Sequence, residues 1–162
     1  MATRSTITLK IKKSTKGKTF HFDENKLPIV GGERITCDNE CINKVGDVKI
    51  EKNYLTIYHH WDGYPEGVGK TLVEKYNDYD TILNLLCGGD ASSINGDNVT
   101  QYCAWRGEEW NNNKPSQSDE EPLVQQNYAY LFKRRKWYFK NYPKEKWQDL
   151  GKYLKKLDEQ QK

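Results

Sequence analysis

The segment from Tyr54 to Pro65 constrains the fold more than any other, because a strand pattern runs directly into a helix start. Residues 54–60 alternate apolar and polar positions and are rich in aromatic and β-branched side chains, which is typical of a half-buried strand. Gly63 provides a tight turn, and Pro65 suits the first position of a helix, where no backbone N–H is needed. We therefore expect a strand, a sharp turn and a helix in succession.

Periodicity elsewhere predicts an α+β fold, a single domain built mainly on an antiparallel β-sheet. Further strands are expected at residues 6–12, 19–22, 48–51 and 99–105. Two hairpins are expected, one pairing 48–51 with 54–60 and the other pairing 128–132 with 136–139. The polar run from Glu108 to Glu121 predicts a mobile loop.

Two short helices are expected after the turn, the second from Tyr79 to Cys87, where Gly88 and Gly89 stop it. A final amphipathic helix is expected to open at Pro143. Its apolar residues, Trp147, Leu150, Leu154 and Leu157, are spaced 3, 4 and 3 apart, as in a narrow heptad seam. Such a helix either lies on its own sheet or pairs with a second copy of the chain in a homo-oligomer.

Composition indicates one economical domain whose ends are basic. Apolar residues make up 35% of the 162 residues, and aromatic residues supply 12%. Residues 1–18 carry six Lys or Arg and no acid, residues 133–162 carry eleven against four acids, and the middle is acidic. Basic ends are compatible with nucleic-acid contact, whereas packing of the ends against the acidic middle is the simpler interpretation.

The chain shows no apolar window of membrane-spanning length and no apolar signal region near Met1, so we expect a cytosolic protein with no membrane contact. Its four cysteines are then expected to be thiols. Cys37 and Cys41 have a zinc-like spacing, but two further ligands are lacking nearby, so they are only weak metal candidates. No metal or cofactor is expected.

Candidate chemistry is densest in the turn that contains His60, Trp61, Asp62 and Tyr64. On a continuing strand His60 and Asp62 would share a face with Tyr58, and a carboxylate beside an imidazole fixes its tautomer. Such a pair could serve a general base or a metal site, as in a metal-dependent hydrolase. The alternative is structural, with Asp62 capping the helix near Pro65 and His60 a satisfied core or rim residue.

Other polar residues are expected to gather at the same end of the domain. Asp90, Ser92 and Ser93 follow the helix-stopping glycines and form either an ordinary turn or the lining of an anion pocket. Arg106 and Glu108 end the strand at 99–105. Arg106 could hold a phosphate or carboxylate, or it could form an internal salt bridge to Asp62 or Asp90.

The hairpin at 128–140 interleaves aromatic and basic residues. Its candidate nucleic-acid contacts are Lys133, Arg134, Arg135, Lys136 and Trp137. Such a surface can stack bases and hold a backbone, although aromatic residues on paired strands more often form cross-strand core pairs.

Taken together, several motifs resemble a family of small proteins carried by bacteriophages and prophages. They are residues 1–7 (Met-Ala-Thr-Arg-Ser-Thr-Ile), 60–65 (His-Trp-Asp-Gly-Tyr-Pro), 89–94 (Gly-Asp-Ala-Ser-Ser-Ile), 106–108 (Arg-Gly-Glu) and 137–138 (Trp-Tyr). Compared with that family, residues from about 12 to 50 resemble an insertion. The chain then divides into an α+β core at 1–142 and a basic C-terminal helix at 143–162.

The resemblance implies an accessory protein of a phage, working in the cytoplasm of the host bacterium. Small phage proteins without enzyme motifs commonly act by binding, in host takeover or against host defence. We therefore expect a non-enzymatic protein that binds a host protein, a defence component or a small anionic ligand such as a nucleotide. Nucleic-acid binding through the basic hairpin and C-terminal helix is the alternative, and a hydrolase based on His60 and Asp62 is a weaker one.

Overall fold

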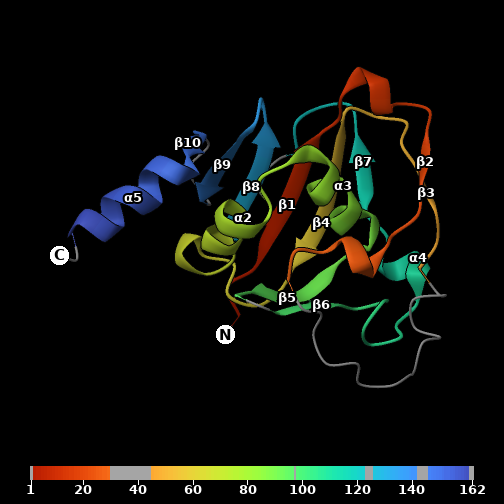
Figure 1. Cartoon of the computed structure of the whole chain (residues 1–162), viewed down its shortest axis with the longest axis horizontal. Coiled ribbons are helices and arrows are strands. Elements are labelled where there is room, and N and C mark those ends of the chain that lie inside the picture. Colours follow the sequence, from red (N-terminus) through yellow and green to blue (C-terminus); the bar gives the residue numbers. More distant parts are fainter. Residues whose placement is uncertain (1, 30–44, 97, 123–125, 142–145, 161–162) are drawn as a thin grey trace.

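The computed structural model describes residues 2–29, 45–96, 98–122, 126–141 and 146–160 (Figure 1). They form a single α+β domain around one large mixed sheet, with the neighbour order β10-β9-β8-β1-β4-β5-β6 and with β7 beside β4. The strands of this sheet are β1 (Ser5–Lys10), β4 (Tyr54–His59), β5 (Ala91–Asn95), β6 (Asn98–Gln101), β7 (Ser116–Ser118), β8 (Tyr128–Lys133), β9 (Lys136–Asn141) and β10 (Gln148–Asp149).

Strand β1 lies at the centre of the sheet. It pairs antiparallel with β4, where Ser5 faces His59, and parallel with β8, where Ser5 faces Tyr128. The other edge of β4 is shared, because β5 joins it in parallel at His59 while β7 joins it antiparallel at Tyr54–Thr56. Most pairings are antiparallel, as the sequence predicted, and the expected hairpin of β8 and β9 is confirmed.

Helices cover one face of this sheet (Figure 1). A π-helical turn η3 (Pro65–Gly69) leads into α2 (Lys70–Lys75), and α3 (Tyr79–Cys87) follows with the predicted bounds. The Asp78 carboxylate caps α3 by accepting the Thr81 N–H, and Gly89 beyond its end has φ 85°, the left-handed conformation that glycine tolerates. A one-turn helix, α4 (Trp110–Asn113), precedes β7.

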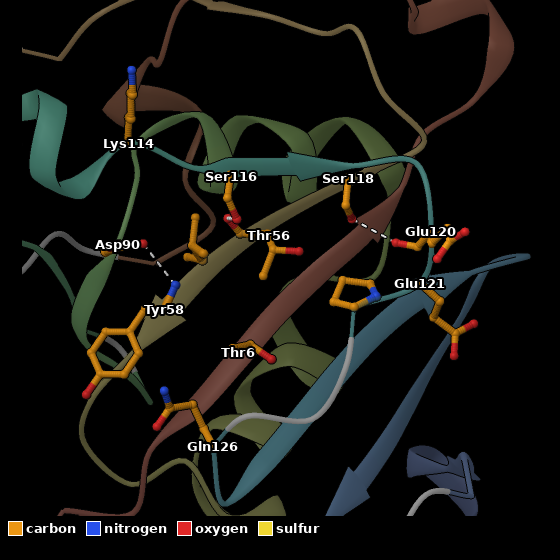
Figure 2. Close-up of a pocket in the computed structure, with 12 residues that line it drawn as sticks. Thr6, Thr56, Tyr58, Asp90, Lys114, Ser116, Ser118, Glu120, Glu121 and Gln126 are labelled. Atoms are coloured by element: carbon orange, nitrogen blue, oxygen red, sulfur yellow. Dashed lines mark hydrogen bonds between the residues drawn. The ribbon is translucent and has the colours of Figure 1, made fainter.

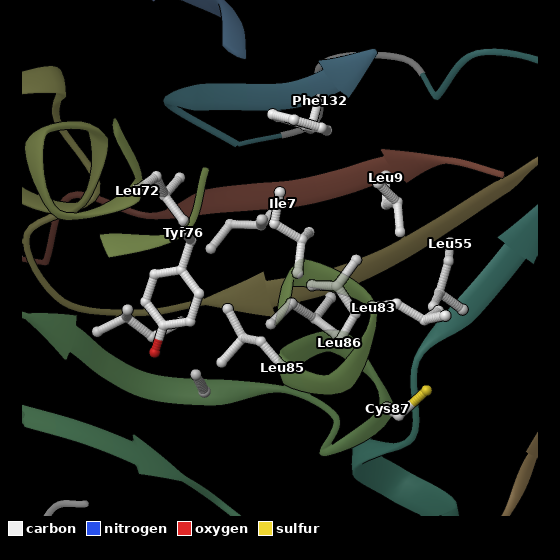
Figure 3. Packing of buried hydrophobic residues seen from close by; sticks show 14 of the residues in the cluster. Ile7, Leu9, Leu55, Leu72, Tyr76, Leu83, Leu85, Leu86, Cys87 and Phe132 are labelled. Carbon is white, nitrogen blue, oxygen red and sulfur yellow. The ribbon is translucent and has the colours of Figure 1, made fainter. Parts of the chain in front are cut away.

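The core lies between this face and the helices (Figure 3). Alternation along β4 directs Leu55, Ile57 and His59 inward, and on β1 Ile7 and Leu9 do the same. Leu83, Leu85 and Leu86 of α3 pack against them, with Tyr76 beyond the end of α2. Thr6, Thr56 and Tyr58 consequently lie on the opposite face of the sheet.

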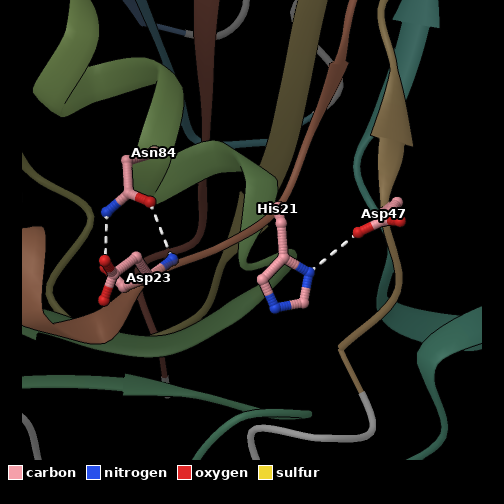
Figure 4. A network of polar contacts seen from close by, with 4 residues as sticks. All are labelled: His21, Asp23, Asp47 and Asn84. Atoms are coloured by element: carbon pink, nitrogen blue, oxygen red, sulfur yellow. Dashed lines mark hydrogen bonds and ion pairs between the residues drawn. The ribbon is translucent and has the colours of Figure 1, made fainter.

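Within the segment at 12–50, the described residues pack into the same core. Its elements are η1 (Lys13–Thr15), β2 (Thr19–Phe20) and η2 (Glu24–Lys26). Phe22, between β2 and η2, packs edge-on against Trp105, with the ring centroids 6.0 Å apart. Figure 4 shows two anchors, the backbone of Asp23 held by the Asn84 amide of α3, and His21 bonded to Asp47 at 2.8 Å. Whether the segment is an insertion stays a prediction.

The hairpin predicted between 48–51 and 54–60 is wrong. Strand β3 (Val48–Lys49) pairs with β2 in a separate two-stranded sheet, while β4 pairs with β1. The predicted loop at Glu108–Glu121 is also corrected, because it contains α4 and the edge strand β7. The polar sequence of β7, Ser-Gln-Ser, gives no alternation signal, and the strand exists through its pairing with β4.

The C-terminal helix α5 (Leu150–Gln160) begins later than Pro143, and Trp147 lies before it, so the predicted heptad seam loses its first member. Leu150 is buried, and Tyr153 lies 4.9 Å from Phe139 of β9. The first turns of α5 therefore lie on the chain's own sheet, while the later turns extend away from the body (Figure 1). None of the helices in the described ranges is long and apolar enough to span a bilayer.

Candidate functional site

A buried histidine fixes the end of β4. The Nε2 atom of His59 accepts the Ile94 N–H at 3.0 Å, so Nδ1 carries the proton and donates to Ser5 Oγ at 3.1 Å. Burial, together with the neighbouring His60, lowers the pKa of His59 to about 3. This neutral imidazole thus joins β1, β4 and β5 at the point where the chain leaves the sheet.

The turn at His60–Pro65, which we name the aromatic turn, separates the two residues expected to act as a pair. His60 hydrogen-bonds through Nδ1 to the Tyr58 hydroxyl at 2.6 Å, which confirms that these two side chains share a face. Asp62 instead accepts the Asn95 amide at 2.8 Å and the Tyr64 hydroxyl at 3.3 Å. Its φ of 56° turns it away from the strand direction, so the predicted His60–Asp62 pair is not formed.

The predicted helix cap at Asp62 is also corrected. Tyr64 occupies the cap position of η3 and makes no side-chain cap bond. Asp62 contributes through its backbone carbonyl, which accepts the Val68 N–H at 2.9 Å. Its carboxylate remains engaged with Asn95 and Tyr64.

Two glycines allow the aromatic turn to pack against the domain. A Cβ on Gly63 would lie 2.6 Å from the Thr3 carbonyl oxygen, and one on Gly67 would lie 2.4 Å from that of Asp62. Gly63 donates its N–H to the Thr3 carbonyl, and its own carbonyl accepts the buried Tyr130 hydroxyl at 2.7 Å. The turn is therefore held by direct backbone contacts with the domain.

The same turn exposes its large aromatic side chains. Trp61 is 49% exposed and Tyr64 36% exposed, and they are the large hydrophobic residues that the described part of the chain leaves open to solvent. The Trp61 ring contacts His60 edge-on, with centroids 4.8 Å apart, and its backbone N–H donates to the Ser92 carbonyl. These rings therefore stand on a fixed backbone.

Asp90 lies beside this turn and is half-buried. Its Oδ1 accepts the Tyr58 N–H at 2.9 Å, and its own N–H donates to the Asn113 carbonyl. Burial raises the pKa of Asp90 to about 6, although the Tyr58 bond opposes the shift. Ser92 and Ser93 do not lie in a loop as expected, because β5 begins at Ala91 and both belong to that strand. Ser93 lies opposite Thr100.

Arg106 and Glu108 join the same neighbourhood through Tyr102. The Ser92 hydroxyl bonds to the Tyr102 phenol, and the Arg106 guanidinium lies over the Tyr102 ring at 5.3 Å. Arg106 pairs with Glu108 at 3.2 Å rather than with Asp62 or Asp90. Burial raises the pKa of Tyr102, and Tyr58 adds to this shift.

A cleft of about 490 Å³ extends from Tyr58 and Asp90 over the outer face of β1 and β4 (Figure 2). Its floor carries the hydroxyls of Thr6 and Thr56. Residues of β7 and the segments beside it form the walls, among them Lys114, Ser116, Glu120 and Glu121. Carboxylates outnumber the single lysine among these residues, so the cleft is a poor environment for an anion.

The hairpin at 128–140 forms as predicted, but its aromatic side chains and its charged side chains lie in different environments. Trp137 is buried and donates its Nε1–H to the Tyr76 carbonyl at 2.7 Å, and Phe132 packs edge-on against it. Lys136 is exposed and pairs with Asp149 at 3.7 Å, while Arg134 and Arg135 form the exposed turn. Aromatic residues of this hairpin therefore belong largely to the core, as in cross-strand pairs.

Side chains that could bind a metal ion are not clustered in the described part of the chain. No group of three or more His, Cys, Asp or Glu side chains there could hold a metal ion. Cys37 and Cys41 lie outside the described residues. Cys87 and Cys103 are buried thiols, and burial raises the pKa of Cys87 to about 12.

Sequence reasoning missed three members of this neighbourhood, Asn95, Tyr102 and His59. Asn95 holds Asp62 from β5, and Tyr102 connects Ser92 to Arg106 just after β6. Their positions follow from the pairing of β5 with both β4 and β6. The Asn95-Gly96 pair is a turn signal that could have indicated the β5–β6 hairpin, whereas no local pattern indicates the pairing of β5 with β4. For His59 a signal was present, since alternation along β4 places it on the core face with Ile57.

No protein-family profile, curated protein or solved structure matches the chain.

Proposed function

We propose that this chain is a non-enzymatic binding protein whose contact surface for a partner protein is centred on Trp61 and Tyr64. The resemblance to phage proteins extends the proposal to a host or defence protein as partner, in the cytoplasm of an infected bacterium. The observation that carries it is the exposure of these two rings on a turn whose backbone is fixed.

Exposed Trp and Tyr side chains are the residues that most often dominate the binding energy of protein interfaces. Here they project from a backbone pinned to Thr3, Ser92 and Val68, so little conformational entropy would be lost on binding. His60, Arg106 and Glu108 nearby offer the polar rim that surrounds such anchors.

A partner protein is favoured over a small anion at this site. Arg106 already pairs with Glu108, and the adjoining cleft places Asp90, Glu120 and Glu121 opposite Lys114 alone. A hydrolase is also less favoured, since His60 bonds to Tyr58 and Asp62 to Asn95 and Tyr64.

The test is affinity purification of the tagged chain from infected cells, with Trp61→Ala, Tyr64→Ala and the control Tyr138→Ala handled in parallel. Tyr138 is a half-buried aromatic residue on β9, which β8 and β1 separate from β4 and the aromatic turn. A partner retained by the wild type and by the control should be lost by both turn variants.

With the purified partner, the Trp61→Ala variant should bind about 30-fold more weakly, as expected for an anchor worth roughly 2 kcal/mol. Thermal unfolding of each variant checks that its fold is intact. Equal retention of the partner by Trp61→Ala, Tyr64→Ala and the wild type would sink the proposal.

A further inference from the structure

The end of the sheet opposite the aromatic turn carries two adjoining grooves lined by cations. The first, of about 580 Å³, is lined by Lys10 at the end of β1, by Lys12 just after it, and by Lys133, Arg134 and Arg135 at the β8–β9 turn. Leu9 pairs with Phe132, and this register brings the two basic segments side by side.

The second groove, of about 360 Å³, continues from the first. It shares Asn77, Phe132 and Arg135 with it and adds Lys136 of β9 and two cations of α5, Lys152 and Lys155. Together the two grooves, which we name the basic track, present eight cationic side chains and two carboxylates. The track therefore runs from the end of β1 to the surface of α5.

The two carboxylates do not neutralise the positive charge of the basic track. Asp78 is engaged as the cap of α3, and Asp149 accepts the Lys152 N–H and pairs with Lys136. Across the described ranges, no carboxylate lies within ion-pair distance of the other seven cations that line the grooves, Lys10, Lys12, Lys133, Arg134, Arg135, Lys152 and Lys155. The positive charge of the track is therefore available to an external anion.

We infer that the basic track binds the phosphodiester backbone of a nucleic acid without reading its sequence. A row of cations over two connected grooves matches a polymer that carries one charge per phosphate. The rings beside the track are not free to stack bases, because Phe132 and Trp137 are buried and Lys12 lies 4.4 Å over the Tyr79 ring. An acidic protein would need apolar anchors, and the exposed ones lie at the other end of the sheet.

The probes are a fluorescent 20-nucleotide single strand and a 20-base-pair duplex, and the full chain is titrated into each at 50 and 200 mM KCl. If about four phosphates of the single strand are engaged, its affinity should fall roughly 50-fold between the two salt concentrations. Binding of either probe with such a salt dependence supports the inference. Binding of neither at 50 mM overturns it.

The key variant is Arg134→Asn combined with Arg135→Gly. Both positions have positive φ in a two-residue hairpin turn, where Asn-Gly is the favoured pair, so the charges are removed without harm to the fold. Affinity should fall about tenfold at 100 mM KCl, and the slope of log affinity against log salt should become shallower by roughly 1.4.

A second variant, Lys152→Gln with Lys155→Gln, tests whether the track continues onto α5 and should weaken binding similarly. The matched control, Lys26→Gln with Lys49→Gln, removes the same charge from exposed positions outside both grooves and should bind within twofold of the wild type. Equal losses in the control and the track variants overturn the inference, as does competition by poly-glutamate as effective as that by an unlabelled oligonucleotide. Trp61→Ala should leave this binding unchanged, which separates the outcome from that of the partner protein.

Discussion

The aromatic turn and the β8–β9 turn lie at opposite ends of one sheet and hold strained backbone in different ways. Asp62 at one end, and Arg134 and Arg135 at the other, are the non-glycine residues with positive φ in the described ranges. Such conformations are costly for L-residues and cluster at functional sites. The two-residue hairpin turn itself requires positive φ at Arg134 and Arg135, whereas no such hairpin accounts for Asp62.

The two ends differ in what holds the strained residues in place. Asp62 is fixed by the Asn95 amide, by the Val68 N–H and by the close approach of Gly67. The two arginines are held only by the hairpin that they close, with Lys133 paired to Lys136. A rigid end suits anchors that must meet one shape, whereas two exposed arginine side chains suit a polyanion of variable path.

The largest effect is expected from a substitution that disrupts the backbone packing of the aromatic turn. Gly63→Ala would drive a Cβ against the Thr3 carbonyl and break the hydrogen bond that the Gly63 N–H donates there, so we expect a loss of about 2–4 kcal/mol. Chemical denaturation measures the change in the free energy of unfolding.

Gly151→Ala is the control for this substitution, because a Cβ there meets only an ordinary contact with Asp149 at 3.5 Å and lies in helix α5. It should be neutral or stabilising by up to about 1 kcal/mol. Wild-type stability in Gly63→Ala would mean that the turn is not held by close backbone contact.

A smaller effect concerns Asp90. Its pKa is about 6 in the folded chain, against an ordinary value of 3.8, so burial destabilises its charged form. The destabilisation is absent below pH 3.8, grows between pH 3.8 and 6, and is complete above pH 6. Asp90→Asn keeps an oxygen for the Tyr58 N–H and should stabilise the fold at pH 7 by about 1–2 kcal/mol, allowing for solvent screening, and by nothing near pH 3.5.

Denaturation at the two pH values measures this difference, with Asp119→Asn at an exposed position as control. A gain in stability that is the same at both pH values would show that desolvation of the charge is not its origin. A gain confined to pH 7 would show that the Asp90 carboxylate lowers the stability of this end of the sheet, as is common at functional sites.

The smallest effect is expected at the β8–β9 turn. Arg134→Asn with Arg135→Gly should raise the free energy of unfolding by about 1 kcal/mol, because both replacements tolerate positive φ. Thermal unfolding at high salt, where repulsion between the neighbouring cations is screened, isolates this backbone contribution. A lower free energy of unfolding in the double variant would contradict the interpretation that this turn is strained.

Sequence patterns predicted the elements better than their neighbours in space. The helix at Tyr79–Cys87 and the hairpin of β8 and β9 followed from local periodicity and turn residues. The pairing of β3 was predicted wrongly. A short turn joins β3 to β4 and favoured a hairpin, whereas its actual partner, β2, lies on the other side of the segment at 30–44. Strand β7 was missed because an edge strand with polar side chains has no periodic signal.

The candidate site was predicted in part for the same reason. The sequence indicated that polar groups of three segments would gather at one end of the sheet, and Tyr58, Asp90, Ser92 and Arg106 do lie in one neighbourhood. It could not indicate the positive φ of Asp62, which is accommodated by the close approach of Gly67 and the hydrogen bond from Asn95. The predicted pairing of His60 with Asp62 is wrong because of this one backbone dihedral angle.

The position of β1 has a consequence for how this chain is made. β1 lies between β4 and β8, and its partner in β8 is more than a hundred residues further along the chain. On the ribosome β1 can pair with β4 early, but its second edge stays open until β8 has been synthesised. Folding should therefore be slow for a domain of this size, and a half-made sheet with an exposed central edge is the species that chaperones would need to protect.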